Sequence, residues 1–265
     1  MTPWRLLKLD TNDASANMAI DEAIMRARIR GLVPNTLRFY RWNPSAVSIG
    51  RFQKISNEVH VDNCKERGVD IVRRITGGGA VYHDSKDEIT YSVIVEKEDL
   101  GTRDVVVAYT TISNGLIEAA KTLGVDANFD PGDPRNCPSV AVEKRKISGS
   151  AQFNKGGVLL QHGTFLLDVD LTKMFTFLKV PWAKSTSEVI CVAKERITSV
   201  KQELASDVSL EEAHRSLITG FQKALAVDFS DERSLTTYER ELIQTLKREK
   251  YETKKWNLTG KTPLF

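Results

Sequence analysis

The sequence has few cysteines, no long apolar run and no large excess of either charge. Its three cysteines, Cys64, Cys137 and Cys191, lie far apart, so they predict neither a disulfide framework nor a zinc site. It contains neither an 18-residue apolar run nor a signal-peptide pattern, which indicates a soluble protein with no membrane partner, by default in the cytoplasm. The net charge of +3 gives no argument for a nucleic-acid partner.

The 265 residues include 41% hydrophobic residues, enough to build a substantial core. Apolar residues recur at helical spacing in four segments, 18–30, 108–123, 209–225 and 235–250. The third begins with the capping-box pattern Ser209-Leu210-Glu211-Glu212. Strand-like runs cover residues 37–40, 46–49, 69–75, 89–95, 140–142, 146–153 and 158–169. Antiparallel pairing is expected for the runs before residue 96, and a meander with short turns for the last three.

The most informative stretch is residues 73–84, which reads Arg73-Arg74-Ile75-Thr76-Gly77-Gly78-Gly79-Ala80-Val81-Tyr82-His83-Asp84. Glycine accepts positive φ and has no Cβ, so three in a row allow backbone N–H groups to converge on phosphate oxygens. An arginine fork can complete the contacts. The alternative is a glycine hairpin turn with surface arginines. Because strand-like runs flank the loop, it is neither a Walker nor a Rossmann loop.

A second candidate region is the strand-like run that contains Lys146. Alternation predicts that one face carries Lys146, Ser148, Ser150 and Gln152, and the other Ile147, Gly149, Ala151 and Phe153. The small residues leave space for a ligand beside the ammonium. The alternative is a surface lysine whose stem packs on the protein. His83 and His162 are candidate pocket residues, with Asp84 placed to orient His83 or a metal-bound water, although a lone histidine is more often structural.

Several blocks, taken in order over nearly the whole chain, resemble the lipoate-protein ligase and octanoyltransferase superfamily. The blocks are Asn17–Ala23, Leu37–Pro44, Ser48–Gln53, Arg73–Asp84, Lys146–Gln152, Gln161–Thr164 and Glu252–Asn257. The chain is most similar to the catalytic subunit of archaeal-type bipartite lipoate-protein ligases. That resemblance implies the biotin/lipoate protein ligase catalytic-domain fold, which is α/β with a large mixed, mostly antiparallel sheet flanked by helices.

The resemblance also implies a domain organisation. The catalytic domain is expected to span residues 1–258, followed by a tail at 259–265, without the accessory C-terminal domain of single-chain ligases. We therefore expect a separate small accessory subunit. The acceptors implied are lipoyl domains of the 2-oxoacid dehydrogenase acyltransferase component and the glycine-cleavage H protein.

The function that the resemblance favours is attachment of lipoate or octanoate to an acceptor lysine through an acyl-adenylate, with ATP and Mg²⁺. Lys146 matches the family's catalytic lysine, and its ammonium would neutralise the repulsion between carboxylate and phosphate. The metal ligands are unknown. The aromatic residues Tyr40 and Trp42, with Val47 and Ile49, are expected to line an acyl tunnel or simply to pack in the core. The residues expected to bind the cofactor are Arg73, Arg74, Gly77, Gly78, Gly79, Ala80, Val81, Tyr82, His83, Asp84, Lys146, Ser148, Gly149, Ser150, Ala151 and His162.

The alternative is an ATP-independent octanoyltransferase that draws on octanoyl-acyl-carrier protein. In cysteine-type transferases a thiolate upstream of the lysine forms a thioester, and Cys137 lies nine positions before Lys146. Tyr91-Ser92 also looks more like the transferase pattern. Transferases tend to carry arginine where this chain has Gly79, and this difference favours the ligase. A biotin ligase, whose glycine-arginine-glycine signature is missing, and a non-enzymatic binding module rank lower.

Overall fold

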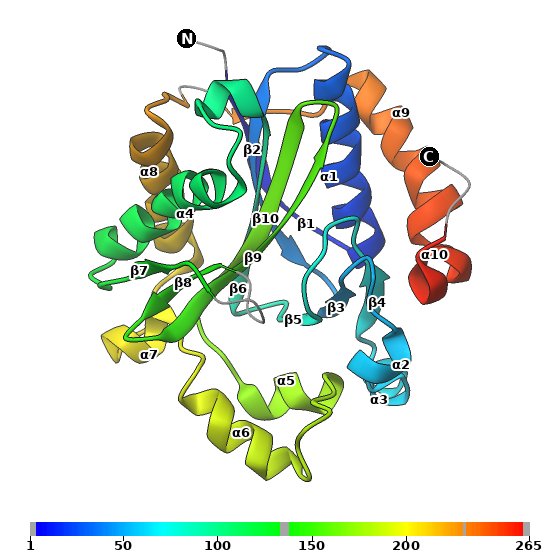
Figure 1. Cartoon of the computed structure of the whole chain (residues 1–265), viewed down its shortest axis with the longest axis vertical. Helices are drawn as coiled ribbons and strands as arrows, with labels where there is room; N and C mark the ends of the chain where they lie inside the picture. Colours follow the sequence, from blue (N-terminus) through cyan, green and yellow to red (C-terminus); the bar gives the residue numbers. More distant parts are fainter. Residues whose placement is uncertain (1–3, 133–137, 230–231, 262–265) are drawn as a thin grey trace.

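The computed structural model describes residues 4–132, 138–229 and 232–261, which form two sheets with helices around them (Figure 1). In spatial order the large sheet consists of β11 (Glu232–Arg233), β1 (Trp4–Asn12), β2 (Asn35–Trp42), β6 (Glu88–Glu96), β10 (Val158–Leu166), β9 (Arg145–Lys155), β8 (Ser139–Val142) and β7 (Asn128–Asp130). The small sheet consists of β4 (Asp70–Arg73), β3 (Ala46–Ile49) and β5 (Val81–His83). Since β1 is parallel to β2 and β11 while the other neighbours in the large sheet are antiparallel, the expected mixed sheet is confirmed.

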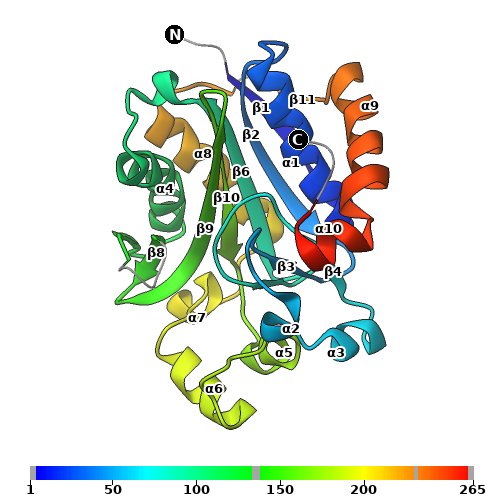
Figure 2. The same ribbon diagram turned by 45° about the vertical axis from the view of Figure 1, so that its right-hand side comes forward.

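Helices cover both faces of the large sheet (Figures 1 and 2). On one face lie α4 (Val105–Thr122) and α8 (Leu210–Leu225), and on the other α1 (Ala14–Ile29) and α9 (Thr237–Leu246). The other helical segments are α2 (Ile55–Glu58), α3 (Val61–Glu66), η1 (Lys97–Leu100), α5 (Leu171–Phe177), α6 (Thr186–Lys194), α7 (Val200–Leu204), the π-helical turn η2 (Lys247–Tyr251) and α10 (Lys254–Thr259). None of the helices in the described ranges is both long and apolar enough to span a membrane.

Each face of the large sheet has its own apolar core. Leu116 of α4 and Phe221 of α8 are fully buried in one, and Ile24 of α1 belongs to the other. Helices α4 and α8 can approach closely because Gly220 has no side chain. A Cβ at this position would lie only 2.2 Å from the carbonyl oxygen of Gly115. Because both faces of the large sheet are packed, its strands hold the polar residues described below in fixed positions.

Capping side chains set where several helices begin. Ser209 accepts a hydrogen bond from the backbone N–H of Glu212, and α8 ends at Leu225 as predicted. In the predicted segment 235–250, Thr236 and Glu239 form a complete capping box, so the helix starts at Thr237. Helix α8 could be located from its cap because the cap involves residues three positions apart, whereas α9 was located from the spacing of its apolar residues.

The antiparallel pairing predicted for the early strands is wrong for β3 and β4. These strands are parallel, with Ile49 opposite Arg73, because α2 and α3 form a crossover between them. The strand that follows the glycine motif also begins earlier in the sequence than predicted. It is β5, which begins at Val81 and pairs antiparallel with β3, rather than the run that begins at Ile89.

Candidate active site

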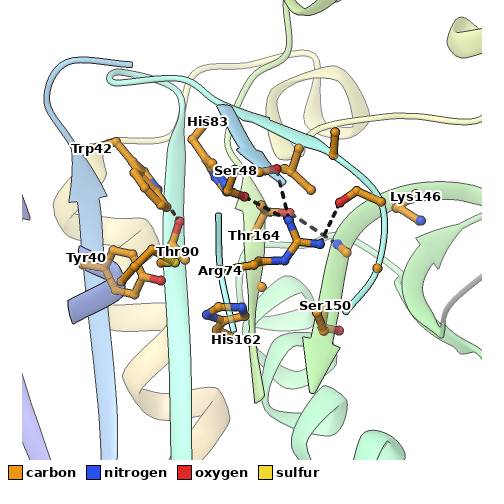
Figure 3. Close-up of a pocket in the computed structure, with 18 of the residues that line it drawn as sticks. Tyr40, Trp42, Ser48, Arg74, His83, Thr90, Lys146, Ser150, His162 and Thr164 are labelled. Carbon is orange, nitrogen blue, oxygen red and sulfur yellow. Dashed lines mark hydrogen bonds between the residues drawn. The ribbon is translucent and has the colours of Figure 1, made fainter. Parts of the chain in front are cut away.

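A cavity of about 290 Å³ lies between the large sheet and the loop that joins β4 to β5 (Figure 3). This loop, residues 74–80, contains the three glycines and is called the glycine loop below. The predicted site residues that line the cavity are Arg74, Gly78, Gly79, Ala80, Val81, His83, Lys146, Gly149, Ser150, Ala151 and His162. The two sheets therefore bring together the two motifs that are separated by some 60 positions in the sequence.

Within the described residues, the cavity lining leaves out five predicted site residues, Arg73, Gly77, Tyr82, Asp84 and Ser148. Cys137 lies outside the described residues. The residue that follows it in the sequence, Pro138, lines the cavity.

Arg74 is buried and organises the glycine loop from within. Its guanidinium donates hydrogen bonds to the carbonyl oxygens of Gly77 at 2.8 Å and Gly79 at 2.7 Å. It also donates to the carbonyl oxygen of Ser48 at 3.1 Å. Gly78 has a φ of 89°, which residues with a side chain rarely adopt. The arginine that was predicted to hold phosphates therefore binds the carbonyl groups of its own loop.

Arg73 fixes the C-terminal helix rather than lining the cavity. Its guanidinium donates to the carbonyl oxygens of Gly50 at 3.0 Å, Trp256 at 3.0 Å and Leu258 at 3.1 Å. In return, the indole N–H of Trp256 donates to the carbonyl oxygen of Arg73 at 2.7 Å. These bonds use the guanidinium for structure, so they do not fit the predicted nucleotide-binding role.

Lys146 lines the cavity because β9 contains a bulge. Lys146 lies opposite Ala141 on β8 and Ser148 lies opposite Val140, which leaves Ile147 as an extra residue. Since Val140 and Ala141 are neighbours on β8 and point to opposite faces, Lys146 and Ser148 do so too. The prediction that these two residues share a face is therefore wrong. Ser148 is fully buried on the other side of the strand.

Small residues leave room for the stem of Lys146, which is half-buried. A Cβ added to Gly149 would lie 3.6 Å from the lysine Cδ, so the stem passes directly over this glycine. Ser150 and Ala151 continue the wall of the cavity. On the neighbouring strand, a Cβ on Gly163 would lie 2.3 Å from the carbonyl oxygen of Gly149, so only glycine allows this close pairing.

His162 and Asp21 form a buried polar network beside the cavity. Nδ1 of His162 lies 3.0 Å from the Asp21 carboxylate, and Nε2 lies 2.8 Å from the hydroxyl of Thr76 on the glycine loop. Arg38 donates to Asp21 at 2.9 Å. Burial lowers the pKa of His162 and outweighs the opposing effect of Asp21, so the imidazole is neutral at pH 7. Burial raises the pKa of Asp21, but His162 and Arg38 outweigh it and hold the pKa below its ordinary value.

The lowered pKa of His162 makes the stability of the protein dependent on pH. The unfolded chain binds more protons at this histidine than the folded chain, so stability rises with pH through the range where a free imidazole titrates. We expect the free energy of unfolding to fall between about pH 7 and about pH 5, with a smaller slope in His162→Gln. Guanidinium unfolding at a series of pH values measures both slopes. Equal slopes in the two proteins would contradict this account.

His83 is held between a carboxylate and a hydroxyl. Its Nδ1 lies 2.8 Å from Oε1 of Glu88, and its Nε2 lies 2.8 Å from Oγ of Ser48. The ring stacks on Trp42, with centroids 4.1 Å apart. In Figure 3, His83 and Ser48 lie beside each other above Arg74, with Lys146 to the right. These contacts fix the imidazole in one orientation.

Asp84 does not orient His83 as predicted, because the carboxylate that contacts Nδ1 of His83 belongs to Glu88. The Asp84 carboxylate instead accepts a hydrogen bond from the hydroxyl of Tyr82 at 3.1 Å and pairs with Lys173 at 2.6 Å. Tyr82 stacks on Phe177, with centroids 5.1 Å apart. Both residues therefore connect the small sheet to α5.

Two of the four residues expected to line an acyl tunnel reach the cavity. Tyr40 and Trp42 line it, whereas Val47 and Ile49 are fully buried in a separate apolar cluster around the small sheet. Their strand, β3, points these two side chains away from the cavity and directs Ser48 toward it, as alternation requires.

The sequence interpretation missed several polar residues at the site, namely Asp21, Ser48, Glu88 and Thr90. A signal was present for two of them. Asp21 interrupts the apolar face of α1, and Ser48 interrupts an otherwise apolar strand. A polar residue in a fully buried stretch indicates a hydrogen-bonded partner. Among the described residues, no group of three or more His, Cys, Asp or Glu side chains could hold a metal ion.

The chain is similar to known proteins over nearly its full length. Residues 13–222 match the family model described as the lipoyl protein ligase A/B catalytic domain. The octanoyltransferase LipM of Geobacillus kaustophilus (strain HTA426) is 37% identical, with 96% of this chain and 97% of the relative covered. The octanoyltransferase LipM of Symbiobacterium thermophilum is 38% identical, with 97% and 98% covered.

A solved structure with the same fold is that of a bi-partite lipoate protein ligase and its E2 lipoyl domain from Thermoplasma acidophilum. It superposes with a TM-score of 0.86 at 33% identity and covers 100% of both chains. The fold expected from the sequence is therefore confirmed.

The curated relatives correct the predicted activity. Eight of them, each covered over nearly its full length, are octanoyltransferases, so the interpretation that favoured an ATP-dependent lipoate-protein ligase is wrong. Gly79 was one feature that favoured the ligase, and in the structure its carbonyl oxygen accepts a hydrogen bond from Arg74. The match over residues 13–222 and the full-length relatives establish that the chain belongs to the lipoyl protein ligase A/B catalytic domain family.

Proposed function

We propose that this chain transfers an octanoyl group from an acyl-carrier protein to a lysine of a lipoyl-domain protein without ATP. The observation that carries the proposal is the shared activity of the eight curated relatives, each covering 96% or 97% of this chain. The cavity volume of about 290 Å³ supports it. This volume lies just below the usual range for small-molecule sites, about 300 to 1,000 Å³, which suits a short acyl chain better than an acyl chain together with a nucleotide.

In this proposal Cys137 is the nucleophile. The support is its place in the chain, because the next residue, Pro138, lines the same cavity as Lys146. A nearby ammonium favours the thiolate form of a cysteine, which is the form that attacks a carbonyl. The two other cysteines are poorly placed for this role, since Cys64 is buried in the small-sheet cluster and Cys191 is exposed on α6.

The transfer would take place in two steps. The Cys137 thiolate attacks the octanoyl carbonyl, a new C–S bond forms, and the carrier leaves as a thiolate. The acceptor lysine then attacks the same carbonyl, a C–N bond forms, and the bond to Cys137 breaks. Each step passes through an oxyanion, which the ammonium of Lys146 would stabilise. The walls of the cavity, including Tyr40 and Trp42, would hold the acyl chain.

The acceptor we propose is a lipoyl domain, of the 2-oxoacid dehydrogenase acyltransferase component or the glycine-cleavage H protein. This is supported by the structural relative from Thermoplasma acidophilum, which was studied with its E2 lipoyl domain. A separate accessory subunit was expected for adenylation. Because no adenylate forms in the transfer we propose, neither that subunit nor ATP with Mg²⁺ should be needed.

The proposal is tested by mixing the purified chain with octanoyl-acyl-carrier protein and a lipoyl domain, without nucleotide. Mass spectrometry should find an octanoyl group first on the chain, in a form that hydroxylamine removes, and then on the acceptor lysine. Addition of ATP and Mg²⁺ should leave the rate unchanged. Modification of the acceptor only when ATP and free acid are supplied would reject the proposal.

The position of the glycine loop gives a further prediction. A Cβ on Gly50 would lie 2.1 Å from the carbonyl oxygen of Gly78, so Gly50→Ala must displace the glycine loop from its position at the cavity. We expect the transfer rate to fall about 10²-fold, as for other small displacements of an active-site group. Gly77→Ala is the matched control, because its Cβ would meet nothing within 4 Å. Steady-state rates of both variants test this, and equal rates would contradict it.

A further inference from the structure

A line of hydrogen bonds runs from the cavity into the protein through Ser48, His83 and Glu88. Oγ of Ser48 lies 2.8 Å from Nε2 of His83, and Nδ1 of His83 lies 2.8 Å from Oε1 of Glu88. Ser48 and His83 both line the cavity, whereas Glu88 lies behind them and is 1% exposed. The arrangement places a hydroxyl, an imidazole and a carboxylate in series.

The neighbouring groups determine which way the protons point along this line. The Glu88 carboxylate can only accept hydrogen bonds, so the ring proton of His83 lies on Nδ1 and is donated to Oε1 of Glu88. Nε2 then accepts from the hydroxyl of Ser48, whose oxygen accepts in turn from Arg74 at 3.2 Å. The hydroxyl of Thr90 also donates to Oε1 of Glu88, at 2.5 Å. In this arrangement the imidazole has a lone pair ready to take up a proton through Ser48.

Glu88 is suited to stabilise an imidazolium ion. Within the described residues, its second oxygen, Oε2, is buried without a hydrogen-bond partner. Buried polar atoms in proteins are nearly always paired, so an orphan carboxylate oxygen needs an explanation. A buried carboxylate with few hydrogen bonds is stabilised more strongly by a neighbouring positive charge than one whose oxygens are all bonded. His83 carries such a charge after it takes up a proton.

The two steps of the proposed transfer differ in their need for a base. Exchange of the acyl group between two thiols releases no net proton. Attack by the acceptor lysine does, because an ammonium group becomes an amide nitrogen while Cys137 recovers only one proton. The second step therefore needs a group that removes a proton from the incoming amine.

We propose that Ser48, His83 and Glu88 relay the proton released when the acceptor lysine attacks the acyl thioester. The proton passes from the amine to Oγ of Ser48 as the hydroxyl proton moves to Nε2 of His83, and Glu88 stabilises the imidazolium. This inference rests on the proposed transferase function. Besides His83, the charged or titratable residues that line the described part of the cavity are Tyr40, Arg74, Lys146 and His162.

The relay is tested by measuring the two steps separately. In His83→Gln, octanoyl transfer from the carrier to the enzyme should proceed within about twofold of the wild-type rate, and transfer to the lipoyl domain should fall about 10²-fold. In Ser48→Ala and Glu88→Gln the first step should likewise stay near the wild-type rate, and the second step should slow down by a smaller factor than in His83→Gln. His60→Gln is the matched control, because His60 is exposed and outside the cavity. Thermal unfolding of each variant checks that the fold is retained.

A second measurement separates a relay from a merely structural role. Hydroxylamine is a neutral amine at pH 7, so it needs no proton removed before it attacks. With hydroxylamine as acceptor, His83→Gln should regain most of the wild-type rate. Equal losses with both acceptors, or in both steps, would overturn the relay. Absence of any acyl-enzyme in the wild type would reject the transferase proposal itself.

Discussion

Cys137→Ser is expected to lower octanoyl transfer about 10⁴-fold, because the variant loses the group that forms the covalent intermediate. A serine hydroxyl is far less acidic than a thiol, and a nearby ammonium cannot ionise it appreciably at neutral pH. The acyl-enzyme should therefore disappear from the mass spectrum. The measurement is the single-turnover rate of octanoyl transfer to the lipoyl domain, with octanoyl-acyl-carrier protein as donor.

Cys191→Ser provides the matched control for this variant. Cys191 is exposed on α6 and lies outside the cavity, so its replacement should leave the rate unchanged. If Cys137→Ser kept the wild-type rate, a thioester at Cys137 could not be an intermediate. If instead Cys191→Ser were the inactive variant, the nucleophile would have been assigned to the wrong residue.

Lys146→Met is expected to lower the same rate about 10³-fold, the loss typical of removing an oxyanion-stabilising group. Methionine has a similar length and can follow the same path over Gly149, where the stem of the lysine passes. The substitution therefore removes the charge and leaves the shape of the cavity nearly unchanged. Both the formation of the acyl-enzyme and its transfer to the acceptor should slow down, since each step passes through an oxyanion.

Lys144→Met serves as the control for this second variant. Lys144 is exposed in the turn between β8 and β9, two positions from Lys146, and does not line the cavity. It should retain activity. A wild-type rate in Lys146→Met, or an equal loss in Lys144→Met, would show that the ammonium inside the cavity is not what the reaction requires.

The wrong choice between ligase and transferase came from the glycine loop. From the sequence alone, Gly79 in place of an arginine indicates a backbone that approaches phosphate. In the folded protein, Arg74 binds the carbonyl groups of Gly77 and Gly79 from inside the loop. A run of glycines specifies conformational freedom, but which groups the backbone then meets depends on the side chains around it.

The fold was largely predictable because its signals are local. Ser209 and Glu212 cap α8 across three positions, and β6 and β10 lie within one or a few residues of the apolar runs that predicted them. The parallel pairing of β3 with β4 was not predictable in this way. This pairing depends on the path of the chain through α2 and α3, which cannot be predicted from any short sequence pattern.

The site was predictable in its motifs and not in its contacts. The sequence by itself identified an arginine-glycine loop and a lysine on a strand of small residues as parts of the site, since these are properties of short segments. The tertiary structure decided that a bulge at Ile147 turns Lys146 to the cavity, and that His162 meets Asp21 across 141 positions. Hydrogen bonds of this kind join residues distant in sequence, so only the packed chain, in which buried polar groups must find partners, fixes which residues meet.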